Sequence, residues 1–253
     1  MPTPFTHLEI AQRLLDDPQL PPAVRDDLNA ERGAFLLGSV AADARVNAGT
    51  ARADTHFYQY GVPIEQPPHE TMLDAHPHLR APAQVDHRAF VAGYVAHLSV
   101  DEHWTTNMTY PHFALREWSD QQERYYMLHI ILIHMDERDY DRLESWQAPA
   151  LRRAEPDGWL PFMGDDTLRS WRDLIHEQIC DGGDSRTLTI FGGRIGKTPD
   201  QMRRILDSPT AIQTRLWQNV PRQSLAEVEA GMYAYAREMV QAYWQSIPTR
   251  ENP

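Results

Sequence analysis

Apolar residues recur every three or four positions along most of the chain, which is the spacing that gives a helix one buried side. The first predicted helix has Thr6 as its N-cap, with Glu9 three residues later, and the Asp17-Pro18 pair ends it. Pro22 begins a second helix. The stretch from Gly33 to Ala44 (GAFLLGSVAADA) is rich in small residues, which favours a helix that packs closely against its neighbours.

The rest of the chain continues this helical pattern. Further helices are predicted over His69 to Ala75, Val85 to Trp104, Asp120 to Trp146, Thr167 to Cys180, Met202 to Leu206, Ala211 to Trp217 and Ser224 to Ile247. The remainder of Asn47 to Pro82 carries five prolines and is predicted to be mainly loop. Leu188 to Phe191 (LTIF) is the one good strand candidate and is too short to make a sheet. The pattern therefore predicts an all-α fold.

The pattern also predicts a single compact domain over residues 1–253. Glu155 to Gly164 is the only plausible domain boundary, and it is short. The helices predicted after it have the pattern of helices that cover a core, and they are not expected to form an independent core of their own. We therefore expect residues 1–145 to build any functional site, and residues 146–253 to form helices that cover it.

Charge and composition narrow the functional classes. The formal net charge is -12, which would repel a phosphate backbone, so a nucleic-acid binder that works through a basic patch is unlikely to have this sequence. The single cysteine, Cys180, cannot form an internal disulfide. The start of the chain has no secretory signal pattern, and no stretch has the roughly 18 consecutive apolar residues of a membrane span. These features predict a cytoplasmic protein without a transmembrane segment.

Histidines mark the part of the chain that could carry chemistry. There are 12 of them, and the C-terminal third holds only His176. In the predicted helix Val85 to Trp104, His97 and Asp101 share a face with Phe90 and Trp104, because steps of three or four residues return to the same side. A buried carboxylate costs several kcal/mol unless it is paired or binds a metal. A His–Asp hydrogen bond in a helical core and a metal site both satisfy that requirement.

Three more candidate ligands lie outside this helix. His7 is on the first helical turn, Asp43 ends the small-residue helix, and His56 lies in the segment Asp54-Thr55-His56-Phe57-Tyr58. Taken singly, each of these residues is more often an ordinary polar residue than a metal ligand. Together with His97 and Asp101 they form a set of imidazole and carboxylate groups, which suit zinc.

The order of four segments, PTPFTHLEIA, AFLLGSVAADA, THFY and AGYVAHLSVDEHW, resembles the zinc-dependent phospholipase C family, which shares its helical fold with the single-strand-specific zinc nucleases. The resemblance covers residues 1–145. It implies a compact multi-helix domain with up to three zinc ions between its helices. By motif, His7 would bind one zinc, Asp43, His56 and His97 another, and Asp101 would bridge the two.

The third metal site departs from the family pattern. Family members complete it with a later histidine and a carboxylate one helical turn beyond, but His129 is followed four residues on by Ile133. His129 and Asp136 are seven apart and share a helical face. We expect both to face the site, with one as a zinc ligand and the other supporting it.

The resemblance implies a zinc-dependent hydrolase that cleaves a phosphoester with an activated hydroxide, with Asp43 as ligand and catalytic proton acceptor. Its substrate would be a small phosphorylated molecule or a lipid headgroup, and it would hold two or three zinc ions. Two alternatives stay open: an enzyme of different chemistry that uses iron or manganese on the same scaffold, and a non-catalytic metal-binding protein. The sequence makes no prediction of oligomeric state.

Overall fold

A computed structural model of the protein describes residues 1–247, which form helices joined by turns and loops without any β-strand. The prediction of an all-α fold is confirmed. The predicted strand Leu188 to Phe191 is wrong, since these residues lie in the helix Thr187–Arg194 and bury Phe191. A four-residue apolar run has the same composition in a short buried strand and in one side of a helix, and here no other strand is present to pair with it.

The first half of the chain contains the helices that carry most of the candidate ligands. Their bounds are α1 (Pro4–Asp16), α2 (Pro22–Ala30), α3 (Arg32–Ala41), η1 (Ala42–Ala44), α4 (Arg45–Ala48), α5 (Ala53–His56), α6 (Pro68–Ala75), η2 (Pro77–Arg80), α7 (Val85–Trp104) and η3 (Thr105–Ala114). The second half contains α8 (Gln121–Tyr140), α9 (Gln147–Arg152), α10 (Asp165–Ile179), α11 (Thr187–Arg194), α12 (Pro199–Leu206), α13 (Pro209–Ile212), η4 (Gln213–Trp217) and α14 (Arg222–Ser246).

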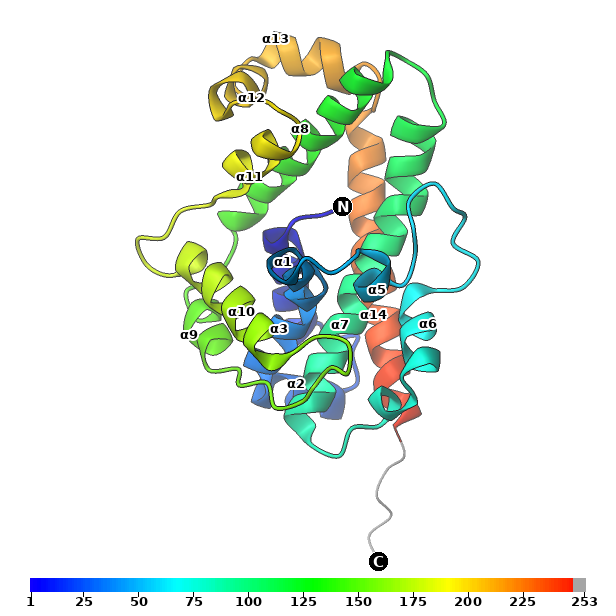
Figure 1. Ribbon diagram of the computed structural model, residues 1–253, viewed down its shortest axis with the longest axis vertical. Coiled ribbons are helices and arrows are strands. Elements are labelled where there is room, and N and C mark those ends of the chain that lie inside the picture. The colour runs from blue at the N-terminus through cyan, green and yellow to red at the C-terminus, as the bar shows by residue number, and fades with distance from the viewer. Residues whose placement is uncertain (248–253) are drawn as a thin grey trace, which may run out of the picture.

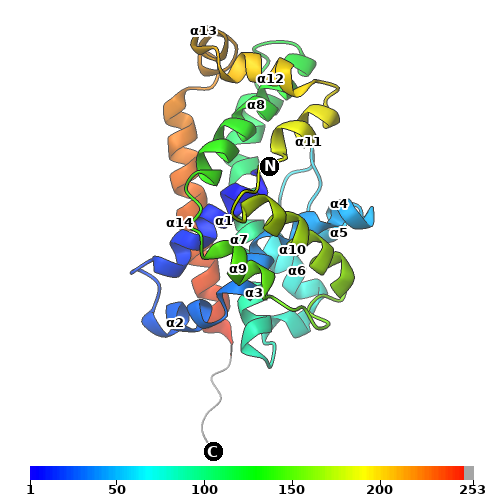
Figure 2. The ribbon, with the colours of Figure 1, turned by 90° about the vertical axis from the view of Figure 1, so that its left-hand side faces the viewer.

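Helix α7 forms the spine of the molecule. It packs against α3 on one side and against α14 on another, and α7 and α14 run together along the long axis (Figure 1). Helix α8 crosses the upper half of the molecule, where α11 to α13 pack near it, and α9 and α10 lie beside α3 in the lower half (Figures 1 and 2). In both views the start of the chain lies near the middle of the molecule, so α1 brings its first turn toward α7 and α8.

Several predicted boundaries differ from the structure, and those of the first helix and of Asp120 to Trp146 have a clear physical reason. Helix α1 begins at Pro4, with Thr3 as N-cap, because proline is well suited to the first helical position. The predicted cap, Thr6, is buried inside the helix, where its hydroxyl donates to Asp139 Oδ2 at 2.8 Å. The predicted helix Asp120 to Trp146 ends at Tyr140, and α9 starts at Gln147, since Pro149 is tolerated only in the first turn of a helix.

Two glycines allow α3 and α7 to cross in backbone contact. A Cβ on Gly93 would lie 2.8 Å from the Ser39 nitrogen and closer still to the Phe35 carbonyl oxygen. A Cβ on Gly38 would likewise meet the backbone of Phe90. Only glycine leaves room for this approach, which brings the carbonyl of Ser39 to the face of α7 that carries His97.

Helix α14 covers α7 and helix α10 packs against α3, so that both help to close the α3–α7 pair from solvent. On α14, Gly231 lies against the His103 imidazole, and the Tyr235 hydroxyl donates to Glu102 at 3.0 Å. From α10, Trp171 Nε1 donates to the Val40 carbonyl at 2.8 Å. One cluster of buried apolar residues includes members from Phe5 to Ile247. The single domain expected over 1–253 stays a prediction for the whole chain, whose last six residues lie outside the described part.

None of the helices within residues 1–247 combines the length and the apolar character that crossing a membrane requires.

Replacing Gly93 by alanine tests the helix crossing. Because the new methyl group meets backbone atoms that cannot rotate away, α3 and α7 must separate, and we expect Gly93→Ala to lower the free energy of unfolding by about 1–3 kcal/mol or more. Chemical denaturation measures this directly. Gly193→Ala, in α11 with open space around its Cβ, is the matched control and should be neutral or slightly stabilising. Equal stability of the two variants would contradict the close crossing.

Candidate metal centre

Helix α7 supplies two side chains at the centre of the molecule. His97 and Asp101 are one helical turn apart, both are fully buried, and His97 Nε2 lies 3.3 Å from Asp101 Oδ2. Neither oxygen of Asp101 has a hydrogen-bond partner among the described residues. The helix therefore presents a buried carboxylate whose charge must be balanced by something other than an ordinary hydrogen bond.

His7 approaches Asp101 from α1. Its ring stacks on the His97 ring, with centroids 4.0 Å apart, and its Nε2 lies 3.5 Å from Asp101 Oδ1. This nitrogen is buried and has no hydrogen-bond partner within the part of the chain that the structure describes. The two oxygens of Asp101 thus face different histidines, Oδ1 toward His7 and Oδ2 toward His97.

Asp43 and His56 complete the cluster from two short helical segments. His56 Nε2 lies 3.5 Å from Asp43 Oδ1 and 3.4 Å from Asp101 Oδ2. Asp43 lies in η1, directly after the α3–α7 crossing, and His56 is the last residue of α5. Phe57 then adopts a left-handed conformation, with φ of 59°, which ends α5 at His56.

Backbone and hydroxyl groups orient two of the histidine rings. The Ser39 carbonyl can only accept, so His97 Nδ1, 2.9 Å away, donates to it. The Thr55 hydroxyl donates to the Arg52 carbonyl, so its oxygen accepts from His56 Nδ1 at 2.9 Å. Both rings therefore turn Nε2 inward, and these two nitrogens lie 3.4 Å apart. Metal-binding histidines are commonly held by such a partner on the other ring nitrogen.

The charges of the cluster favour a cation. Burial lowers the pKa of His56 to about 4 and also lowers the pKa of His7, so both rings are neutral near pH 7. Burial lowers the pKa of His97 as well, but the neighbouring Asp101 outweighs it and raises the pKa overall. Burial alone would raise the pKa of Asp43, yet the proximity of His56 and His97 holds the pKa below the usual range. Within the cluster, the two ionised carboxylates thus face at most one protonated histidine, and the Arg52 guanidinium lies beside Asp101.

Two groups of donor atoms in residues 1–247 have the spacing of metal ligands. One consists of His7, His97 and Asp101, and the other of Asp43, His56 and His97; within each, the donor atoms lie within 4.8 Å of one another. Divalent zinc prefers imidazole nitrogen and carboxylate oxygen as ligands. This set of donors fits that preference, as do the unpaired oxygens of Asp101 and the unpaired His7 Nε2. Because His97 has one inward nitrogen, it can serve only one of the two groups at a time.

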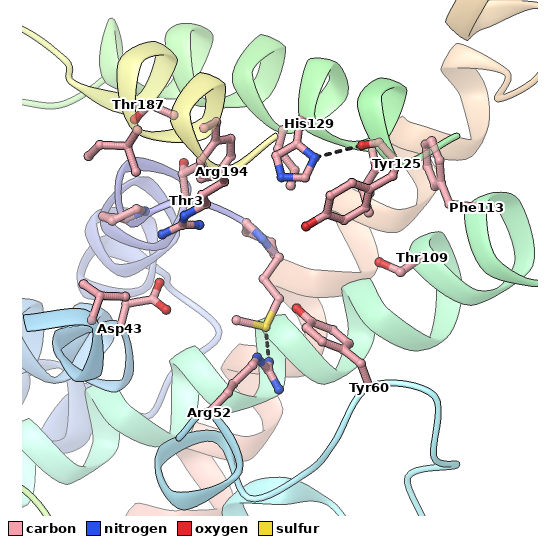
Figure 3. A pocket seen from close by; sticks show the side chains of 18 of the residues that line it. Thr3, Asp43, Arg52, Tyr60, Thr109, Phe113, Tyr125, His129, Thr187 and Arg194 are labelled. Carbon is pink, nitrogen blue, oxygen red and sulfur yellow. Dashed lines mark hydrogen bonds between the residues drawn. The ribbon is translucent and has the colours of Figure 1, made fainter. Parts of the chain in front are cut away.

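A cavity of about 630 Å³ opens beside the cluster. Asp43 lines it and keeps a side-chain exposure of 20%, whereas His7, His56, His97 and Asp101 are closed off behind it. Figure 3 shows the Asp43 carboxylate on one side of this cavity and His129 on the other. A molecule in the cavity therefore meets the cluster at Asp43.

His129 and Asp136, the predicted third site, lie apart from both groups. His129 lines the cavity, its Nδ1 donates to the Tyr125 carbonyl at 2.8 Å, and burial lowers its pKa to about 4. Asp136 is fully buried and accepts from Ser185 Oγ at 3.3 Å. Their assignment as zinc ligands stays a prediction, as do the roles of the other five residues.

Sequence reasoning did not single out Arg52. Its guanidinium lies between the rings of Tyr58 and Tyr60, at 4.2 and 4.4 Å from their centroids, and 3.6 Å from Asp101 Oδ2. It also lines the cavity. Nothing in the local pattern marks this residue, because it comes from the proline-rich segment expected to be mainly loop.

The fold and the cluster define an all-helical protein with a buried histidine–aspartate centre suited to divalent cations. The sequence profile described as zinc dependent phospholipase C matches residues 6–173, more than half of the chain. The chain belongs to this family, and the resemblance seen in its four segments is confirmed. A search of curated proteins and a search of solved structures each returned no match.

Counting bound zinc in single variants tests the arrangement. We expect native mass spectrometry of zinc-loaded protein to find at least two ions per chain. Asp101→Asn should lose more zinc than His7→Ala, because the Asp101 oxygens face both groups while His7 faces one. His78→Ala, at an exposed histidine, is the control and should keep the full count. Full zinc occupancy in Asp101→Asn would exclude a bridging role.

The buried Asp136 generates a separate prediction about stability. Burial raises its pKa to about 7, against the effect of the nearby Thr3, Thr187 and Ser185 hydroxyls, which lower it. The folded protein thus keeps a proton that the unfolded chain releases near pH 4, and the stability gained from that proton is lost as the pH rises toward 7. Asp136→Asn carries no charge at any pH. Relative to wild type, its melting temperature should therefore rise between pH 4 and 8.

The exposed Asp181 provides the control for this comparison, and Asp181→Asn should show no such trend. If Asp136→Asn instead loses zinc and stability together at pH 8, Asp136 acts as an ionised ligand and the neutral assignment is wrong.

Proposed function

We propose that the protein is a zinc-dependent hydrolase that cleaves a phosphoester. The observation that carries this proposal is the buried cluster of three histidines and two aspartates that opens to a large cavity only through Asp43. A centre that only held helices together would need no such opening. Membership of the zinc dependent phospholipase C family supports the same conclusion.

The chain's own residues provide a preorganised set of donors. His56, His97 and Asp43 would hold one zinc ion, His7 would hold another, and Asp101 would bridge them through its two oxygens. Zinc bound there supplies Lewis acidity, which brings the pKa of a water molecule near neutrality and offsets the charge of the phosphoryl group. Ser39 and Thr55 keep the imidazole rings turned inward, so little reorganisation is needed when the site is used.

Asp43 is suited to accept a proton at the edge of the cavity. It is ionised near pH 7, because the nearby His56 and His97 lower its pKa against the effect of burial, and its role as proton acceptor rests on its position. One of its oxygens faces His56, and the side chain is still partly open to the cavity. A water molecule at this edge can therefore be oriented by the Asp43 carboxylate, which then takes up its proton.

Arg52 contributes a positive charge to the same cavity that Asp43 lines. The two tyrosine rings hold its guanidinium in a fixed position, and Tyr58 Oη accepts a hydrogen bond from it at 2.8 Å. With zinc held by Asp101, the Arg52 guanidinium would be available to an anion in the cavity that it lines. A planar guanidinium matches a phosphoryl group well.

The cavity accommodates a small phosphorylated molecule or a lipid headgroup with an attached apolar part. Its walls include several apolar side chains, among them Phe5, Leu128, Leu132, Trp171, Ile175 and Phe191. The net charge of -12 disfavours long polyanions such as nucleic acid. A cytoplasmic location and a third zinc ion stay predictions.

The proposed roles are tested with a panel of phosphomonoesters and phosphodiesters and the zinc-loaded full chain. We expect Asp43→Asn to lower kcat at least about 100-fold, because the proton acceptor is lost while the shape of the side chain is kept. His97→Ala should abolish activity and release zinc. His78→Ala, at an exposed position, should retain wild-type kcat and zinc.

The outcomes separate this proposal from its two alternatives. A zinc-replete protein that hydrolyses no member of the panel would favour a non-catalytic metal protein. Iron or manganese, found by elemental analysis in protein made without added metal, would favour different chemistry on the same scaffold. Activity in Asp43→Asn equal to wild type would exclude Asp43 as proton acceptor.

A further inference from the structure

Helix α11 presents one continuous face to the cavity. Thr187, Ile190, Phe191 and Arg194 all line it, and their spacing of three, four and seven residues places them on the same side of a helix. The helix lies beyond residue 173, where the match to the family profile ends. This wall is therefore built by a part of the chain that the family profile does not describe.

Arg194 introduces a positive charge into this wall without a balancing carboxylate. Its guanidinium end is directed into the cavity, on the side where Asp43 lies (Figure 3). Within residues 1–247 it forms no ion pair, and the contact recorded for its guanidinium is the Phe191 ring, 5.0 Å from the centroid. Its charge contributes to lowering the pKa of both the Met1 amine and His129, which agrees with a position close to these groups.

The other arginines of the cavity wall already have partners. Arg124 donates to the carbonyls of Phe113 and Ser119, and Arg52 is held between two tyrosines beside Asp101. Arg45 donates to the Thr50 carbonyl at 3.4 Å. Among the residues that line the cavity, Asp43 is the one carboxylate. A chain of net charge -12 has thus gathered four arginines around one acidic group at this place.

We propose that Arg194 binds a second anionic group of the substrate, separate from the attacked phosphoryl group, so that phosphoesters with such a group are preferred over those without one and over choline-type esters. This inference rests on the proposed function, because the first charge is the phosphoryl group at the zinc centre. Charge-assisted hydrogen bonds from a guanidinium to an anion are strong and directional. A cationic headgroup at the same place would be repelled by Arg194.

Binding of two headgroup analogues tests the proposal without catalysis. Inositol 1,4-bisphosphate and inositol 1-phosphate differ by one phosphate, and isothermal titration with the zinc-loaded full chain measures both. We expect wild type to bind the bisphosphate about tenfold more tightly or better, and Arg194→Gln to reduce this ratio to within about twofold. Arg204→Gln, at an exposed arginine of α12 that does not line the cavity, should keep the wild-type ratio.

Hydrolysis shows where the second charge lies. A preference for short-chain phosphatidylinositol 4-phosphate over phosphatidylinositol, lost in Arg194→Gln, places it on the headgroup. With this pair of substrates we expect the KM to rise in Arg194→Gln with little change in kcat, and Arg194→Lys to restore part of the preference.

Two results would overturn the proposal: equal binding of the two inositol phosphates by wild type, or an unchanged ratio in Arg194→Gln. Either would show that Arg194 is only a solvated side chain. If no ester is hydrolysed but the bisphosphate still binds through Arg194, the proposed function fails while the assignment of Arg194 stands. Melting temperature and zinc count, expected to be unchanged in Arg194→Gln, confirm that the variant is folded and loaded.

Discussion

The negative charge of Asp101 is buried at the centre of the molecule, and much of the fold is arranged around it. Both carboxylate oxygens lack hydrogen-bond donors among the described residues, and the groups nearest to them are the nitrogens of three histidines and the Arg52 guanidinium. Ionised carboxylates in a protein interior cost several kcal/mol unless cations compensate them. Segments far apart in sequence therefore have to meet here, and divalent cations are the compensation that this set of donors suits best.

The backbone crossing of α3 and α7 determines how well the donors are aligned. Gly38 and Gly93 let the two helices touch, which places the Ser39 carbonyl on His97 and brings Asp43 to the end of the same helix. The Tyr94 hydroxyl, one residue after Gly93, donates to the Thr55 carbonyl at 2.7 Å and so positions the short helix that carries His56. Chemistry at the centre thus depends on residues that would bind no metal themselves.

The two parts of the chain contribute different things to the site. The candidate metal-binding donors lie in the family-matched part, and α11, which lies after it, supplies one wall of the cavity in front of them. A substitution on α11 therefore changes this wall of the cavity while leaving the buried donors in place.

The sequence alone determined the helical character of the chain and one face of α7, because helical periodicity shows which side chains point the same way. That was enough to pair His97 with Asp101, and the motif order then added His7, Asp43 and His56. Periodicity contains no information about distances between helices, so it could place His129 and Asp136 only on a common face; packing puts His129 at the cavity and buries Asp136 beside Ser185, and their roles stay a prediction. The same limit hid Arg52 and Arg194 and allowed LTIF to be taken as a strand. Only tertiary packing decides which side chains from separate segments share a space.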